Sequence, residues 1–186
     1  MSENSSVEDY DVVLLIEQAL TPQDAAQVHS LHEGLEQPVT YHVLLPLEDA
    51  AARVESAMGS LTAGDMLSSP TMPMSESDLD AVRKDCSDRS RAELEQTLTA
   101  LRSSGAVARG QVVAEPPIDA LIAKVAEVDG REVIILTRPH VVAEFFHLDW
   151  TSKARRRLGV PILHLLEQEN FDEQAEGYGS EGITGL

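Results

Sequence analysis

The strongest constraint on the fold is the alternation of short aliphatic runs with segments of helical periodicity along the chain. Residues 12–16 (VVLLI) form a continuous apolar run, which is typical of a strand buried on both faces of a parallel sheet. Strand-like segments recur at residues 39–47, 106–113, 133–136 and 160–166. Strands that alternate with helices imply parallel pairing through right-handed crossovers. The sequence therefore predicts the α/β class, with a five-stranded parallel sheet and helices on both of its faces.

Between these strands, apolar residues repeat with the spacing of amphipathic helices. Thr21 and Pro22 provide an N-cap and a proline at the first helical position. The apolar face of that helix is expected to begin at Ala25 and to continue through Leu31 and Leu35. Further helices are expected over residues 75–104, 116–130 and 149–158, with Gly130 and Gly159 ending the last two.

The composition indicates an acidic cytoplasmic protein. Fourteen Lys and Arg residues against 32 Asp and Glu residues give a formal net charge of −18, and such a surface repels phosphate backbones and anionic lipids. We therefore expect no nucleic-acid partner and no membrane partner. The single cysteine, Cys86, rules out an intramolecular disulfide and fits a reducing compartment, where we expect its thiol to be buried and inert. The apolar run near the start is too short to span a membrane.

One domain accounts for most of the chain. We expect it to span residues 10–167, after a disordered polar stretch at residues 1–9. An insertion at about residues 48–77 is rich in glycine, proline and serine. Residues 168–186 are predicted to be a disordered acidic tail, because the stretch from residue 167 onward holds six acids, four glycines and no Lys or Arg.

Residues 133–166 resemble the corresponding part of a universal stress protein. That family carries a nucleotide-binding signature, G-x-x-G-x9-G-[ST], directly after its fourth strand, followed by a short helix and a last strand of the type P-[VI]-L-x-[VL]. Residues 133–136 (VIIL) match the fourth strand, and residues 160–166 (VPILHLL) match the last. Residues 112–122 and 13–17 resemble the third strand with its following helix and the first strand. The resemblance covers about residues 10–167 and implies a Rossmann-like αβα sandwich.

The signature keeps its spacing in this chain but loses all three glycines. Counted from the fourth strand, its glycine positions fall on Thr137, His140 and Trp150, and its hydroxyl position falls on Thr151. Glycines allow the backbone to approach phosphates and to turn its amides toward them, whereas imidazole and indole rings fill that space. Asp149 is the expected N-cap of the next helix and would repel a phosphate. The resemblance therefore implies ATP binding that is weakened or lost.

Two hypotheses for function follow from this resemblance. The first is a non-catalytic regulatory or stress-response protein with no resident cofactor. The second is a nucleotide-binding stress protein with a rewritten phosphate site for ATP or AMP, where Arg138 or His140 contacts phosphate in place of backbone amides. Glu17 stands at the end of the first strand, where the family has an Asp that meets the adenosine. The degenerate nucleotide site implied by the resemblance comprises Glu17, Thr137, Arg138, His140, Trp150 and Thr151.

A third hypothesis is a metal-dependent enzyme. His140, Glu144 and His147 would share one face of a helix, where two imidazoles and a carboxylate can bind Zn²⁺ or Fe²⁺. Nearby aromatic residues form either a plug over the former nucleotide cleft or a partner surface; they are Phe145, Phe146 and Trp150. A basic cluster has three possible roles: it complements a helix C-terminus, pairs with the acidic tail, or binds a phosphate or an acidic partner. It comprises Lys153, Arg155, Arg156 and Arg157. We assign no metal ligand and no catalytic residue, and favour a protein that is not an enzyme.

The last strand predicts an assembly. Residues 160–166 are aliphatic, and an exposed apolar strand at a sheet edge is a liability that proteins cover or pair. The related family pairs this strand with its copy across a two-fold axis, which implies a homodimer; an unidentified protein partner is the alternative. The expected interface residues, from one face of the strand or the other, are Ile162, His164 and Leu166, or Leu163 and Leu165.

Overall fold

The computed structural model describes residues 9–48, 76–137 and 157–166 of the 186-residue chain. Its elements in chain order are β1 (Tyr10–Ile16), α1 (Pro22–Ser30), β2 (Val39–Pro46), α3 (Glu76–Ser103), β3 (Val107–Val113), α4 (Pro117–Val128), β4 (Glu132–Thr137) and β5 (Ile162–Leu166). Each strand begins and ends within two residues of its predicted position. The proposed insertion and the acidic tail fall mainly outside the described residues, so their boundaries stay predictions.

The five strands form one sheet in the order β3-β2-β1-β4-β5, and every neighbouring pair is parallel. This confirms the predicted α/β class. The chain builds the sheet outward from β1 to β3, then returns to add β4 and β5 on the other side of β1. The strand order therefore reverses between β1 and β4, and β3 and β5 are the two edges.

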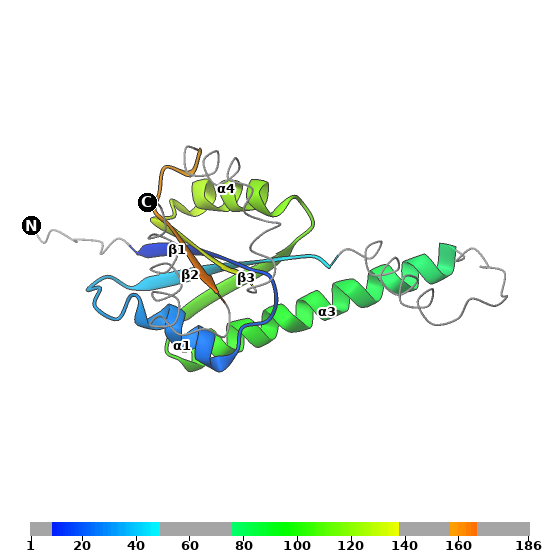
Figure 1. Ribbon diagram of the computed structural model, residues 1–186, viewed down its shortest axis with the longest axis horizontal. Coiled ribbons are helices and arrows are strands. Elements are labelled where there is room, and N and C mark those ends of the chain that lie inside the picture. The colour runs from blue at the N-terminus through cyan, green and yellow to red at the C-terminus, as the bar shows by residue number, and fades with distance from the viewer. Residues whose placement is uncertain (1–8, 49–75, 138–156, 167–186) are drawn as a thin grey trace, which may run out of the picture.

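Helices cover both faces of the sheet. Figure 1 shows α1 and α3 on one side of the strands and α4 on the other. The central strand β1 divides its apolar residues between the two sides: Leu14 and Ile16 join the core under α1 and α3, whereas Val13 and Leu15 join the core under α4. Because both faces of the sheet are covered, a central strand such as β1 needs apolar residues at successive positions, and this requirement explains the continuous run at residues 12–16.

The start of α1 is fixed by a capping box. Thr21 Oγ1 accepts a hydrogen bond from the Asp24 amide at 3.1 Å, and Asp24 Oδ2 accepts one from the Thr21 amide at 3.2 Å. Thr21 is therefore the N-cap, as predicted. The expected end of the apolar face is wrong, because α1 stops at Ser30 and both Leu31 and Leu35 are exposed.

The end of α4 differs from the expected glycine cap. Asp129 takes the left-handed conformation, with a φ of 52°, and its amide donates to the Val125 carbonyl. Asp is one of the few residues that adopt this conformation with little strain, so Gly130 is not needed for the turn. Gly130 is needed for space instead, since a Cβ there would lie 3.2 Å from Val13 Cγ2. Gly159, at a φ of 66°, does take the left-handed conformation expected of it.

The two edge strands carry different protection. On β3, the Arg102 guanidinium donates a hydrogen bond to the Ala108 carbonyl at 2.9 Å. A charged side chain held against an edge strand hinders the addition of another strand. β5 begins at Ile162, two residues later than predicted, because Pro161 has no amide to donate to the ladder.

The longest helix, α3, has 28 residues and runs along one face of the sheet. Its C-terminal half contributes Leu94, Leu98 and Leu101 to the core, while its first turns project beyond the carboxyl ends of the strands (Figure 1). Among the helices that the structure describes, none combines the length and the apolar composition of a membrane span.

Candidate functional site

The reversal of strand order defines the first candidate site. In an open parallel sheet, ligands bind beyond the carboxyl ends of the strands at the point where the order reverses. Here that point lies between β1 and β4, where Ile16 pairs in register with Leu136. Glu17 directly follows β1 and Thr137 is the last residue of β4, so both lie at this end of the sheet. His140 lies outside the described residues, so a shared cavity with Glu17 stays a prediction.

The side chain of Thr137 is buried and hydrogen-bonded to the neighbouring strand. Only 4% of the residue is exposed, and its Oγ1 shares a hydrogen bond of 2.8 Å with His164 Nε2 on β5. Burial lowers the pKa of His164, so the imidazole is neutral at neutral pH. The position that corresponds to the first signature glycine therefore carries a buried side chain tied to the neighbouring strand.

Four of the six residues of the degenerate nucleotide site lie outside the described ranges. These are Arg138, His140, Trp150 and Thr151. The same holds for Glu144 and His147 of the metal hypothesis, and that hypothesis is untested. Within the described residues, no cluster of three or more His, Cys, Asp or Glu side chains could hold a metal ion. The thiol of Cys86 is buried, as predicted.

The expected dimer residues of β5 lie on two different faces. Ile162 packs toward α4 and the half-buried His164 lies two residues along the same strand, whereas Leu165 belongs to the core under α1 and α3. Leu165 is 3% exposed and Leu163 is 37% exposed. Of the predicted pair Leu163 and Leu165, only Leu163 therefore offers an apolar surface. The backbone of Leu166 completes the strand.

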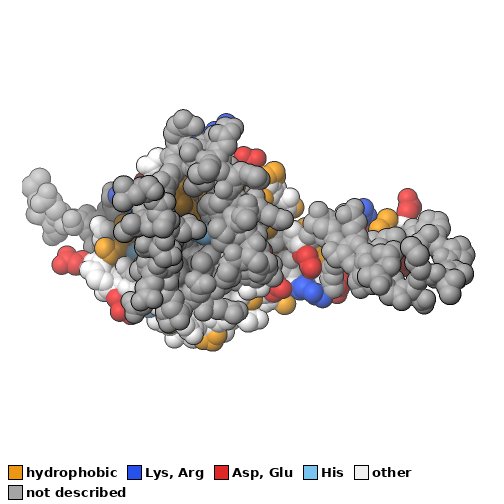
Figure 2. All heavy atoms as spheres, in the orientation of Figure 1, with side chains coloured by type: hydrophobic (Ala, Val, Ile, Leu, Met, Phe, Trp, Pro, Cys, Tyr) orange, Lys and Arg blue, Asp and Glu red, His pale blue; other side chains and the backbone are white. Residues whose placement is uncertain are grey.

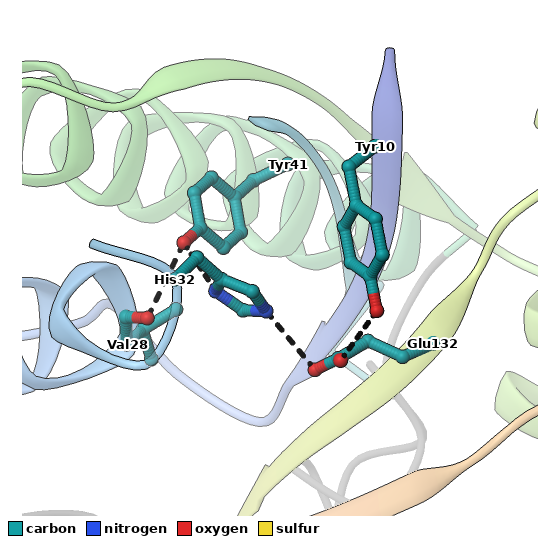
Figure 3. Close-up of polar contacts among 5 residues, drawn as sticks. All are labelled: Tyr10, Val28, His32, Tyr41 and Glu132. Carbon is teal, nitrogen blue, oxygen red and sulfur yellow. Dashed lines mark hydrogen bonds and ion pairs between the residues drawn. The ribbon is translucent and has the colours of Figure 1, made fainter. Parts of the chain in front are cut away.

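A second polar cluster occupies the opposite end of the sheet, and sequence reasoning missed it. Figure 3 shows its four side chains, which we call the tyrosine–histidine brace: Tyr10, His32, Tyr41 and Glu132. His32 Nδ1 lies 2.7 Å from the Tyr41 hydroxyl, and His32 Nε2 donates to Glu132 Oε1 at 3.2 Å. Tyr10 donates to Glu132 Oε2 at 3.1 Å, and the Tyr41 hydroxyl donates to the Val28 carbonyl at 3.3 Å.

The pKa shifts within the brace follow from its hydrogen bonds and from its burial. The hydrogen bond from His32 holds the pKa of Glu132 below its ordinary value, against the opposing effect of burial. Burial raises the pKa of Tyr41 and of Tyr10, and the Glu132 carboxylate adds to both shifts. Both tyrosines are therefore neutral donors beside an ionised carboxylate.

The brace has a structural role in the fold. It connects the first residues of β1 and β4, the interior of β2 and the chain just after α1. His32 is the first buried residue after α1, and it turns inward where Leu31 was expected to do so. With Tyr41 fully buried and bonded on both sides, its hydroxyl is held and not presented to a substrate. The sequence offers two weak signals for this cluster: the polar Glu132 directly before the apolar run of β4, and the aromatic Tyr10 at the start of β1.

Comparison with solved structures identifies the fold. The structure is similar to a universal stress protein from Archaeoglobus fulgidus, with 11% identity, a TM-score of 0.50 and coverage of 83% of this chain and 92% of that one. It is also similar to the hypothetical protein MJ0577, with 11% identity, a TM-score of 0.52 and coverage of 87% and 99%. No family model matches the sequence, and no curated protein matches it significantly. The chain has the fold of universal stress proteins, which confirms the fold implied by the resemblance.

Proposed function

We propose that this chain is a regulatory protein of the universal stress protein type that has no catalytic activity, acts as a homodimer and binds ATP weakly or not at all. The observation that carries the proposal is the burial of the Thr137 side chain. This residue ends β4 at the position of the first signature glycine, and its side chain is buried against His164. A glycine there would leave room for a phosphate beside the backbone, and the threonine with its imidazole partner fills it.

The first test of this proposal is a titration with ATP. We expect a dissociation constant above about 1 mM, which corresponds to a binding free energy of only about −4 kcal/mol. The physical reason is the loss of close backbone approach to the phosphates. Isothermal titration calorimetry with ATP, ADP and AMP measures this directly. Micromolar binding would instead support the second hypothesis, a nucleotide-binding protein with a rewritten phosphate site.

A glycine-restored variant sharpens the same titration. The triple substitution Thr137→Gly, His140→Gly and Trp150→Gly should tighten ATP binding if backbone approach is what the natural chain lacks. Because Thr137 is buried and hydrogen-bonded, its loss also destabilises the fold, so circular dichroism must first show that the variant is folded. A folded variant with unchanged affinity contradicts the glycine argument.

The proposal of a homodimer rests on the difference between the two sheet edges. β3 carries the Arg102 contact on the Ala108 carbonyl. β5 carries Ile162, the neutral His164 and the exposed Leu163. An apolar edge of this kind is suited to pairing with its own copy around a two-fold axis.

Light scattering at micromolar concentration tests the dimer. We expect a mass of twice 20.2 kDa for the natural chain and a shift toward 20.2 kDa for Leu163→Lys, because a charge on each copy of the strand repels its partner. Leu165 is unsuitable for this test, since it lies in the core. Val107→Lys is the matched control: Val107 is 52% exposed on the opposite edge strand, so its variant should remain a dimer. Loss of the dimer in the Val107 variant alone would assign the interface to β3.

A further inference from the structure

A cavity of about 590 Å³ opens at the carboxyl ends of β2 and β3. It lies on the other side of β1 from the β1–β4 site, because β2 and β3 follow β1 in the opposite direction from β4. Neither Glu17 nor Thr137 lines it. A volume of this size falls within the range of small-molecule sites, which is about 300–1,000 Å³. The cavity is therefore separate from the site between β1 and β4.

The walls of this cavity are mostly apolar. Leu47 comes from the end of β2, Val113 from the end of β3 and Pro116 from the turn into α4. Cys86 adds a buried thiol from α3. Thiols and aliphatic side chains make a soft, apolar surface that suits a hydrocarbon or aromatic group and gives it no hydrogen bonds.

The polar groups at the cavity carry an excess of negative charge. Glu48 follows β2 and Glu115 follows β3, so a carboxylate stands at each of the two strand ends. The one cation among the described lining residues is Arg83, which donates to Asp80 at 2.9 Å on its own helix, and this pairing balances its charge. In Figure 2, side chains of both signs gather where α3 leaves the sheet.

The two carboxylates differ in how far they are already neutralised. Glu48 lies 3.9 Å from Arg89, a weak and half-exposed pair. Glu115 has no ion-pair or hydrogen-bond partner among the described residues. The first turn of α4 carries Asp119, which offsets the positive end of the helix dipole at this cavity. Among the described residues that line the cavity, the exposed Glu115 is therefore the acid that is best placed to contact a cationic ligand.

From this arrangement we propose that the cavity binds a small organic cation, an amine with an apolar body. The apolar body lies on Leu47, Val113 and Pro116, and the ammonium group donates hydrogen bonds to Glu115 and to Glu48. The net charge of −18 raises the local concentration of cations around the whole molecule and opposes an anionic ligand of the same size. This inference does not depend on the proposed function.

Three probes of one shape test the proposal. Phenethylamine, 2-phenylethanol and phenylacetate present the same ring with a cationic, a neutral and an anionic end. Titrations followed by ¹H–¹⁵N NMR should show phenethylamine shifting the amides of Leu47, Val113 and Glu115, with an affinity at least about tenfold above that of phenylacetate. Equal affinity for the two charged probes, or amide shifts confined to other parts of the chain, would overturn the proposal.

Variants separate the charge from the shape of the cavity. Glu115→Gln should weaken phenethylamine binding by about fivefold to tenfold and leave 2-phenylethanol unaffected. Ala114→Phe should fill the cavity and abolish binding of both. Glu127→Gln, an exposed acid on α4 outside this cavity, is the matched control and should bind as the natural chain does. Because Ala114 and Glu115 are exposed, both variants should keep the fold, which the NMR spectra check. Unchanged phenethylamine binding in folded Glu115→Gln would refute the assignment.

Discussion

Replacing His32 by alanine is expected to lower the free energy of unfolding by about 2–4 kcal/mol. His32 is 6% exposed and makes two contacts, at 2.7 Å to Tyr41 and at 3.2 Å to Glu132. Its removal leaves a cavity, takes one partner from a buried hydroxyl and deprives Glu132 of its strongest donor. For a chain of this size the melting temperature should fall by roughly 5–15 °C, which differential scanning calorimetry measures.

The matched control for this loss is another histidine of the same segment. His29 is half-buried in the last turn of α1, and its Nδ1 has no hydrogen-bond partner within the described residues. His29→Ala should therefore cost less than about 1 kcal/mol. Equal losses for His29→Ala and His32→Ala would mean that the brace adds nothing beyond side-chain packing.

The brace also predicts how stability depends on acidity. The hydrogen bond from His32 holds the pKa of Glu132 below its ordinary value of 4.5. A carboxyl with a lowered pKa in the folded state stabilises the fold fully above its unfolded value, and that contribution is lost as the pH falls through the folded value. The variant Glu132→Gln lacks the titrating group. Its free energy of unfolding should therefore change less than that of the natural chain as the pH falls from the unfolded to the folded pKa of Glu132. Urea unfolding at a series of pH values compares the two slopes.

The second large effect concerns Gly110 in β3. A Cβ at this position would lie 2.7 Å from Leu94 Cδ1 and 3.2 Å from both Cβ and the carbonyl oxygen of Val43. Gly110→Val is expected to lower the free energy of unfolding by about 3 kcal/mol, and Gly110→Ala by about 1–2 kcal/mol. A side chain in a strand regains some conformational free energy relative to glycine, but that gain is below about 1 kcal/mol and does not offset the clash.

Two further variants isolate the clash at Gly110. Gly34→Ala is the matched control, because no atom lies within 4 Å of the added Cβ and its stability should be unchanged or slightly raised. Leu94→Ala removes the closest atom at a cost of its own. The double variant Gly110→Ala with Leu94→Ala should lose less stability than the sum of the losses in the two single variants. Additive losses in chemical denaturation would show that Leu94 is not the obstacle.

The central strands were predictable from the sequence because burial on both faces leaves little freedom at each of their positions. The run at residues 12–16 and the four aliphatic residues of β4 identify central strands without further information. The parallel class followed from the alternation with helices, and the position of Thr137 at the end of β4 followed from the resemblance. These features depend on local pattern, which a single sequence contains.

The brace was not predictable, because its members meet only through the register of three strands. His32 alone is a polar residue after a helix, and nothing nearby in sequence shows that Tyr41 and Glu132 surround it. The dependence on strand register also explains why Leu31 was wrongly expected on the apolar face of α1. The helical spacing extended that face to Leu31, whereas the folded chain buries His32 and leaves Leu31 exposed. The cavity at Glu115 likewise depends on α3 passing the ends of two strands, a tertiary arrangement that spacing does not encode.

The hydrogen bond from Arg102 to the Ala108 carbonyl bears on polymerisation. A sheet with two open edges can add copies head to tail, and such an assembly has no point at which it closes. With a guanidinium held on β3, growth by strand pairing is left to the β5 edge. In the proposed homodimer, the β5 edge of each copy would pair with the other copy across the two-fold axis, and strand pairing would then end at two copies. Without that arginine, the β3 edges of such a dimer would be open to pairing with further chains.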